Sequence, residues 1–136
     1  MISARWVVFA LLVASWVGCG GSDEVVVTGE LYHKNELYKP QPGEQVMIVF
    51  GEEQNGQVTG NVIPTRLKQD GSFEITGPNN TGIRPGKYRV GVSSMPEVPV
   101  PGAPMEDKFQ GAYEVTKSPV TVEVSSSNRH IKVELP

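Results

Sequence analysis

Short runs of alternating apolar and polar residues recur along the chain from Val25 onward. Alternation with a period of two is typical of β-strands that bury one face, and no window in this part of the chain has the 3.6-residue period of an amphipathic helix. The pattern predicts seven short strands, at residues 25–33, 46–50, 61–69, 72–76, 87–93, 120–124 and 131–135. Seven strands at these intervals indicate an all-β sandwich of two sheets.

The alternation also predicts the core and one turn. We expect Val46, Ile48 and Phe50 to point inward from a single strand. Asp70-Gly71 lies between two predicted strands, and both residues tolerate the positive φ angles of a tight turn, so a β-hairpin is predicted there. The other expected core residues are Phe73, Ile75 and Tyr88.

The segment 95–118 interrupts the pattern. Its prolines, with Pro119 nearby, exclude a central strand from its first half. The segment is longer than ordinary hairpin loops, which favours a functional or flexible loop. Because an exposed proline-rich segment is preordered for docking, we expect a partner contact at its first part, formed by Met95, Pro96, Val98, Pro99, Pro101 and Pro104. A disordered or merely packed connection is the alternative.

Composition and charge narrow the class of protein. The length of 136 residues suits one domain, and 38% hydrophobic residues with 20% charged residues are compatible with a folded core. The net charge is −3 and no basic run occurs, so the positive surface that binds nucleic acid is missing. We therefore expect a single folded domain with no nucleic-acid partner.

The N-terminal 18 residues have the features of a signal peptide. Arg5 precedes an apolar stretch, Trp6–Val17, that is too short to cross a hydrocarbon core of about 30 Å. The stretch ends at Gly18 and Cys19, and Cys19 is the only cysteine, so it has no intramolecular disulfide partner. We expect a signal helix at 1–18, followed by a processed chain.

The residues Trp16-Val17-Gly18-Cys19 resemble the lipobox of bacterial lipoproteins. Val17, Gly18 and Cys19 match the family pattern, whereas Trp16 stands where an aliphatic residue is usual. The resemblance implies cleavage between Gly18 and Cys19 and lipidation of Cys19. Gly20-Gly21 lacks the aspartate that retains some lipoproteins at the inner membrane, which implies attachment to the outer membrane, facing the periplasm.

This assignment divides the chain into a signal peptide at 1–18, a lipidated linker at 19–24 and a β domain at 25–136. Two or more acyl chains hold a protein at a membrane far more durably than one. The alternatives are a cleaved secretory signal with an incidental cysteine and an uncleaved anchor.

Three motifs in the β domain point to a family. They are Gly29 in the first strand, Asp70-Gly71-Ser72-Phe73, and Pro85-Gly86-Lys87-Tyr88. Together, over residues 25–94, they resemble the carboxypeptidase regulatory-like domain. The resemblance implies a seven-stranded immunoglobulin/transthyretin-like (prealbumin-like) sandwich, here preceded by the signal helix. It also implies an accessory module without catalytic residues.

Histidines and serines give little support for catalysis. His33 and His130 are predicted to be solvated surface residues. Ser93-Ser94 and Ser125-Ser126-Ser127 lack the Gly-x-Ser-x-Gly context of a nucleophile, so they are interpreted as turn or linker residues. No catalytic set is therefore predicted.

Acidic pairs and aromatic residues are equally weak signals. Glu52-Glu53 and Glu106-Asp107 are interpreted as solvated loop carboxylates, and no metal or cofactor is expected. A sugar site would need an aromatic platform, for which the candidates are Tyr32, Tyr38, Phe109 and Tyr113.

The sequence thus predicts a non-enzymatic, lipid-anchored envelope protein that serves as a binding or structural module. Its expected partners are the membrane, through the N-terminal lipid, and an envelope protein or polymer. The alternative function is a carbohydrate-binding or hydrolase-accessory protein that acts on envelope polymers.

Overall fold

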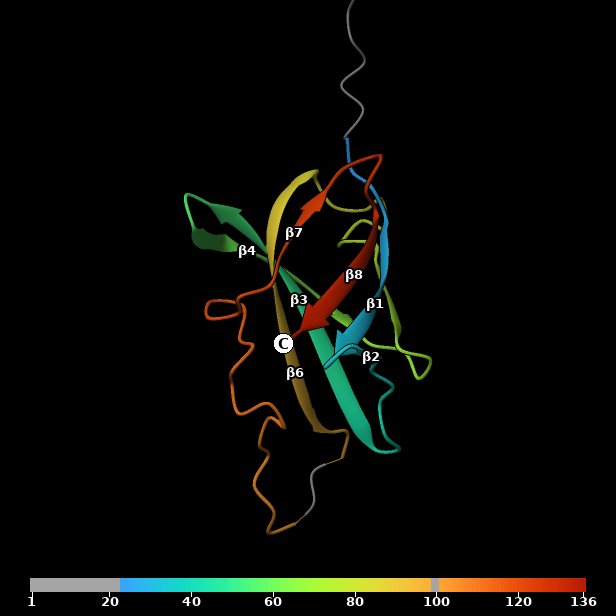
Figure 1. The fold of residues 1–136 in the computed structure, drawn as a ribbon, viewed down its shortest axis with the longest axis vertical. Coiled ribbons are helices and arrows are strands. Elements are labelled where there is room, and N and C mark those ends of the chain that lie inside the picture. Colours follow the sequence, from blue (N-terminus) through green and yellow to red (C-terminus); the bar gives the residue numbers. More distant parts are fainter. Residues whose placement is uncertain (1–22, 99–100) are drawn as a thin grey trace, which may run out of the picture.

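The computed structural model describes residues 23–98 and 101–136 (Figure 1). Over these residues the secondary structure is all-β, without helix, so no membrane-spanning helix occurs in this part of the chain. The expected signal helix, Gly18 and Cys19 lie outside the described residues, as does Pro99. The strands are β1 (Val27–His33), β2 (Glu36–Leu37), β3 (Glu44–Gln54), β4 (Gln57–Arg66), β5 (Ser72–Ile75), β6 (Gly86–Pro96), β7 (Thr121–Val124) and β8 (His130–Leu135).

The strands form two sheets of four (Figure 1). In one sheet β1 is central, with β5 and the short β2 antiparallel to it and β8 parallel to it. In the other the order is β4-β3-β6-β7, and every pair is antiparallel. The prediction of an all-β molecule with two sheets is confirmed for the described residues, which form eight strands where seven were expected. The additional strand is β2, which pairs with the end of β1 across a turn at Lys34-Asn35.

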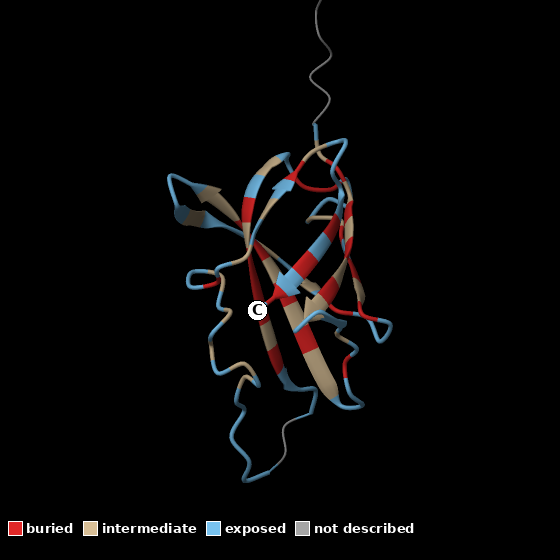
Figure 2. Ribbon diagram, in the orientation of Figure 1, coloured by how far each residue is buried: buried red, intermediate tan, exposed pale blue. Residues whose placement is uncertain are grey.

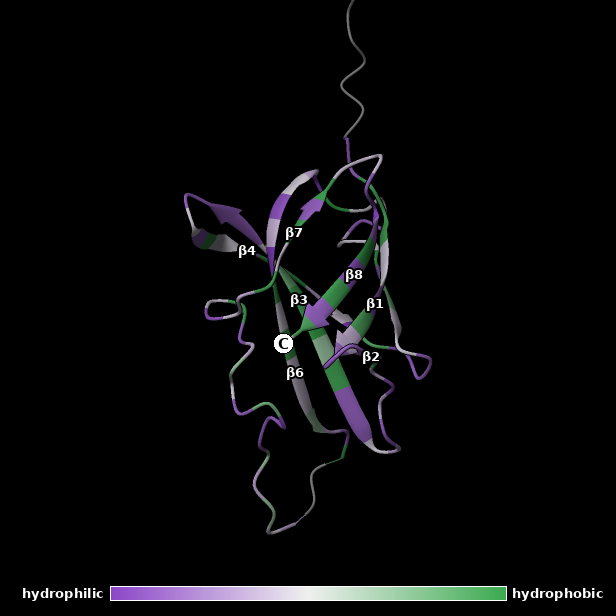
Figure 3. Ribbon diagram, in the orientation of Figure 1, coloured by the Kyte–Doolittle hydropathy of each residue, from purple (hydrophilic) through white to green (hydrophobic). Residues whose placement is uncertain are grey.

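The core lies between the sheets, where the inward residues of each strand meet (Figures 2 and 3). The predicted inward set is confirmed, since Val46, Ile48 and Phe50 are fully buried. The Phe50 ring packs against Phe73 of the facing sheet, with centroids 6.0 Å apart. Truncating one of these rings to alanine typically costs about 3–5 kcal/mol. The full buried set is Val25, Val27, Leu31, Val46, Ile48, Phe50, Leu67, Phe73, Ile75, Ile83, Tyr88, Val90, Val92, Val124, Ile131, Val133 and Leu135.

The Asp70-Gly71 turn forms, but it does not join paired strands. Gly71 has φ of +85°, and Asp70 Oδ1 accepts a hydrogen bond from the Ser72 amide at 2.9 Å. The strand before the turn, β4, pairs with β3, whereas the strand after it, β5, pairs with β1 in the other sheet. The predicted hairpin is therefore wrong, because the chain crosses between the sheets at Leu67, which is buried in the core.

The tight hairpin lies one turn earlier, at Asn55-Gly56. Both residues have positive φ, and Gln54 pairs with Gln57 across them. This two-residue Asn-Gly loop is a strong local hairpin signal that the strand pattern alone did not reveal. It extends β3 well beyond the predicted 46–50 and starts β4 at Gln57, before the predicted residue 61, and this hairpin projects from the body of the molecule in Figure 1.

Candidate functional site: the 95–118 segment and its attachment

The segment 95–118 leaves the end of β6 and returns beside it (Figure 1). Residues 107–120, which we call the returning chain, are connected to β6 by three backbone hydrogen bonds. Lys108 N donates to Ser94 O at 2.8 Å, Val92 N donates to Tyr113 O at 2.8 Å, and Val90 N donates to Val120 O at 2.9 Å. The second half of the segment is thus bound along the edge of β6. The alternative that the segment is disordered therefore does not hold for this second half.

The tip of the segment is exposed and apolar. Met95 is 39% exposed, Val98 71% and Met105 49%. They are three of the five large hydrophobic residues that the described part of the chain leaves exposed, the others being Leu37 and Val62. Pro96, Pro101 and Pro104 are also exposed. The described residues of the predicted partner loop are therefore all exposed, and we call residues 95–98 and 101–105 the apolar tip.

Asp107 closes the turn that follows the apolar tip. Its Oδ1 accepts hydrogen bonds from the amides of Ser94 at 2.9 Å and Phe109 at 3.1 Å, and its Oδ2 accepts one from Gly111 at 3.0 Å. One carboxylate thus satisfies amides on both sides of the tip. Because charged acceptors form the stronger hydrogen bonds, Asp107 fixes the end of β6 against the returning chain.

Glu44, at the start of β3, accepts further hydrogen bonds beneath the tip. The Ser94 hydroxyl donates to Glu44 Oε1 at 2.5 Å, the Tyr38 hydroxyl donates to the same oxygen, and the Gln41 amide donates to Oε2 at 2.8 Å. The Lys108 ammonium lies 3.7 Å from Oε1 and donates to the Tyr38 hydroxyl at 2.9 Å. The network thus joins the start of β3, the end of β6 and the returning chain.

Hydrogen bonds decide which groups of this network are ionised. Burial alone would raise the pKa of the Glu44 carboxyl, but the hydrogen bonds from Ser94, Tyr38 and Gln41 outweigh it, so the pKa lies below its ordinary value. The pKa of Tyr38 is raised, first by burial and then by its bond to Glu44. Glu44 is therefore an ionised acceptor that holds neutral donors in place.

An aromatic cluster attaches the returning chain to the other sheet. The Phe109 ring lies 5.5 Å from His33, 5.9 Å from Tyr38 and 5.4 Å from Tyr113, centroid to centroid. The rings meet edge to face or at a tilt, so they cover one another and leave no flat platform for a sugar. Tyr38, Phe109 and Tyr113 instead extend the core. Tyr32 lies apart, with Lys132 4.4 Å above its ring.

Two glycines make room for the returning chain on the outer face of the second sheet. A Cβ at Gly91 would lie 2.7 Å from Val115 N, and a Cβ at Gly51 would lie 2.8 Å from Val115 Cγ2. Val115 therefore packs directly onto the backbone of β3 and β6. A glycine inside a strand often indicates such a close approach, and this signal could have located the packing from sequence.

Several polar residues lie in places that the sequence did not predict. Ser93 and Ser94 belong to β6, because that strand continues to Pro96, and Ser94 is only 2% exposed. The prediction that they are turn or linker residues is wrong. His33 is half-buried in the aromatic cluster and is not a solvated residue. His130 is exposed, as predicted.

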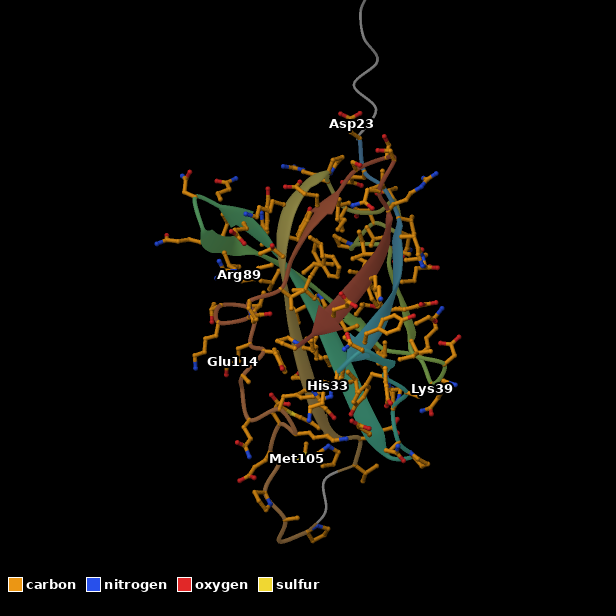
Figure 4. All side chains as sticks on the ribbon, in the orientation of Figure 1. Asp23, His33, Lys39, Arg89, Met105 and Glu114 are labelled. Carbon is orange, nitrogen blue, oxygen red and sulfur yellow. The ribbon has the colours of Figure 1, made fainter. Side chains whose placement is uncertain are left out.

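The acidic pairs also differ from the prediction. Glu52 and Glu53 lie in β3, and the Glu53 side chain, 5% exposed, pairs with Arg89 at 3.3 Å and Lys87 at 3.5 Å. Neither is a loop residue, because the Asn-Gly hairpin extends β3 past them, and Glu53 is not solvated. Arg89 also donates to Gly56 O at 2.9 Å and Thr116 O at 3.2 Å, so it joins the hairpin to the returning chain (Figure 4).

No three His, Cys, Asp or Glu side chains are grouped as metal ligands within residues 23–98 and 101–136. Comparison of the chain with protein-family models, curated proteins and solved structures finds no match.

Proposed function

We propose that the protein is a non-enzymatic binding module of the bacterial cell envelope, anchored through a lipid on Cys19, which docks a partner protein on its apolar tip. We also propose that the chain belongs to the carboxypeptidase regulatory-like domain family, which the Gly29, Asp70–Phe73 and Pro85–Tyr88 motifs resemble. Accessory domains of this kind position a partner and perform no chemistry on it.

The observation that carries the proposal is an exposed apolar surface on a fixed base. Met95, Val98 and Met105 are exposed to solvent. Asp107 and Glu44 of β3 hold the two ends of the tip by accepting hydrogen bonds from Ser94 of β6 and Gly111 of the returning chain. A surface whose ends are fixed loses less conformational entropy when a partner binds. Exposed apolar patches of this kind mark interaction sites.

The position of the tip fits an anchored protein. Asp23, where the described chain begins, lies at one end of the long axis, and Met105 lies toward the other (Figure 4). A lipid attached a few residues before Asp23 leaves the tip facing away from the membrane. The tip is then accessible to a partner in the periplasm.

The docking proposal is tested by replacing Met95, Val98 and Met105 with asparagine and capturing partners from envelope fractions by chemical crosslinking. The triple variant is expected to lose the partners that the parent protein captures. The matched control is Leu37→Asn, which removes an apolar side chain of similar exposure, 37% exposed, from β2. An unchanged partner set in the triple variant, or the same loss in the control, would reject the apolar tip as the docking surface.

The anchor is tested separately by Cys19→Ser. The parent protein is expected to incorporate labelled fatty acid and to fractionate with membranes, and the variant to do neither. A parent protein that takes up no label would contradict lipidation while leaving the docking proposal in place.

The alternative of a sugar-binding or hydrolase-accessory protein gains no support from the aromatic residues. Ser94 is buried beneath the tip and donates its hydroxyl to a carboxylate, and the rings around Phe109 cover one another. A glycan array probed with the protein is expected to show no binding. Binding that Tyr38→Ala abolishes without unfolding the protein would favour the alternative.

A further inference from the structure

A groove opens on the side of the sandwich where β4 of one sheet faces β5 of the other. Its volume is about 580 Å³, which lies in the range of ligand and peptide sites. One wall is β4 from Gly60 to Thr65, and the other is formed by residues 74–78 and 82–84. The groove is separate from the apolar tip, since the two share no residue.

The floor of the groove is part of the hydrophobic core. Ile75, Ile83 and Tyr88 are buried core residues that line it, and Ile63 packs against the same core. The Tyr88 hydroxyl is occupied, because it donates to Arg84 O at 2.7 Å. An apolar side chain that enters the groove would therefore meet an apolar surface without leaving a polar group unpaired.

The rim of the groove is negatively charged. Glu24, Glu52 and Glu74 line it, and Arg84 is the one basic residue among its lining residues. Burial is the largest cause that raises the pKa of the Tyr88 hydroxyl, and the negative charge of Glu52 raises it further. The Glu52 carboxylate therefore acts electrostatically on the floor of the groove. The charge of the groove is thus complementary to a cation.

The two walls of the groove differ in which backbone groups are free to bind a ligand. The outward carbonyls of β5 are already used, since Ser72 O accepts from Lys68 N at 2.8 Å and Glu74 O accepts from Thr65 Oγ1 at 2.7 Å. β4 is an edge strand, paired only with β3. Pro64 removes one donor from its free edge, and a Cβ added to Gly60 would have no other atom within 4 Å, so the space beside this strand has room for an extended chain.

We propose that this groove binds an extended peptide segment of a partner protein in which Lys or Arg side chains alternate with apolar ones. Apolar side chains occupy the floor at Ile75 and Ile83, and the long basic side chains reach the carboxylates of the rim. A free metal ion or small polyamine would use only the charged rim and would make no contact with the apolar residues of the groove. The proposal goes beyond docking at the apolar tip and depends neither on that tip nor on the lipid.

The test is titration of the isotope-labelled protein with a capped hexapeptide of alternating lysine and valine, followed by amide NMR shifts. Shift changes are expected at Val62, Ile75 and Ile83, with affinity that weakens as salt is added. A glutamate-valine hexapeptide of the same length is the matched probe and is expected to bind at least about tenfold more weakly. Shifts elsewhere, or none at millimolar peptide, would overturn the proposal.

Two variants test the charge. Glu52→Gln and Glu74→Gln are each expected to weaken binding of the lysine-valine peptide several-fold, whereas Glu106→Gln, an exposed carboxylate at the other end of the molecule, is expected to leave it unchanged. Glu74 is exposed on β5, so its variant keeps the test valid if Glu52→Gln disturbs folding. Equal binding of the glutamate-valine peptide, or of spermine with the same shifts, would overturn the proposed peptide chemistry.

Discussion

At the scale of single residues, the attachment of the 95–118 segment depends on two carboxylates. Glu44 accepts from Ser94, Tyr38 and the Gln41 amide, and Asp107 accepts from three amides across the base of the apolar tip. Each carboxylate takes the place of water that would otherwise accept hydrogen bonds from these donors. Removing either acceptor leaves buried donors unpaired, which costs more than the bond itself contributes.

Glu44→Gln is expected to lower the free energy of unfolding at neutral pH by about 1–3 kcal/mol, because the charged acceptor is lost. The pKa of Glu44 is lowered by folding, so its stabilisation is complete above the ordinary value of 4.5 and is lost as pH falls through the lower folded-state pKa. Urea unfolding between pH 7 and 3 should therefore show a gap between parent and variant that closes in acid. Glu106→Gln is the control, and a gap that does not narrow as pH falls below 4.5 would contradict this role.

At the scale of elements, β6 and the returning chain act as one unit because two glycines allow contact with Val115. Gly91→Ala would place a Cβ 2.7 Å from Val115 N, which is closer than real Cβ contacts. The variant is expected to lose about 1–3 kcal/mol of stability and to expose the returning chain to protease. Gly60→Ala on β4, where no atom lies within 4 Å, is the matched control. Equal protease resistance in both would show that Val115 is not held by this contact.

The free edge of β4 carries a second prediction at this scale. Leu67 N donates to Val46 O, so the alternation of the antiparallel ladder turns the backbone groups of Ile63 toward β3 and those of Pro64 away from it. Proline at such a position protects an edge strand from pairing with another chain. Pro64→Thr is expected to increase self-association, measured by sedimentation. Pro119→Thr, outside the strands, is the control, and a strictly monomeric Pro64 variant would contradict this role.

At the scale of the whole molecule, the two proposed surfaces lie on different parts of an elongated domain. The groove includes Glu24, next to the residue where the described chain begins, whereas the apolar tip is toward the far end (Figure 4). A protein anchored as proposed would therefore hold one partner near the membrane and another farther from it. This arrangement is a consequence of β1 running from the Asp23 end toward the tip.

The orientation can be measured on vesicles that carry the lipidated protein. A fluorophore on cysteine introduced at Val98 is expected to be quenched less by lipid-bound quencher than one introduced at Asn80, which follows Gly77 in the loop that pairs with Val25. The Cys19→Ser protein, mixed with the same vesicles, should show no difference between the two positions. Stronger quenching at 98 than at 80 would contradict the proposed orientation.

Much of the core followed from the sequence, whereas most of the candidate site did not. Ile131, Val133 and Leu135 alternate with polar residues, and all three are buried, because period two is a local property of a strand. Ser94 and Glu44 lie 50 positions apart and meet only because β3, from Glu44 to Glu52, pairs with β6. No local pattern in the sequence specifies such a register.

The sequence by itself determined the all-β class, the inward faces of the main strands and the exposed, proline-rich character of the loop, since each depends on neighbouring residues. Only the tertiary structure decided that Asp70-Gly71 joins two different sheets, that β8 runs parallel to β1, and that the chain after the apolar tip packs onto Gly51 and Gly91. These features are long-range contacts, whose energies arise only when distant segments are brought together in the folded chain.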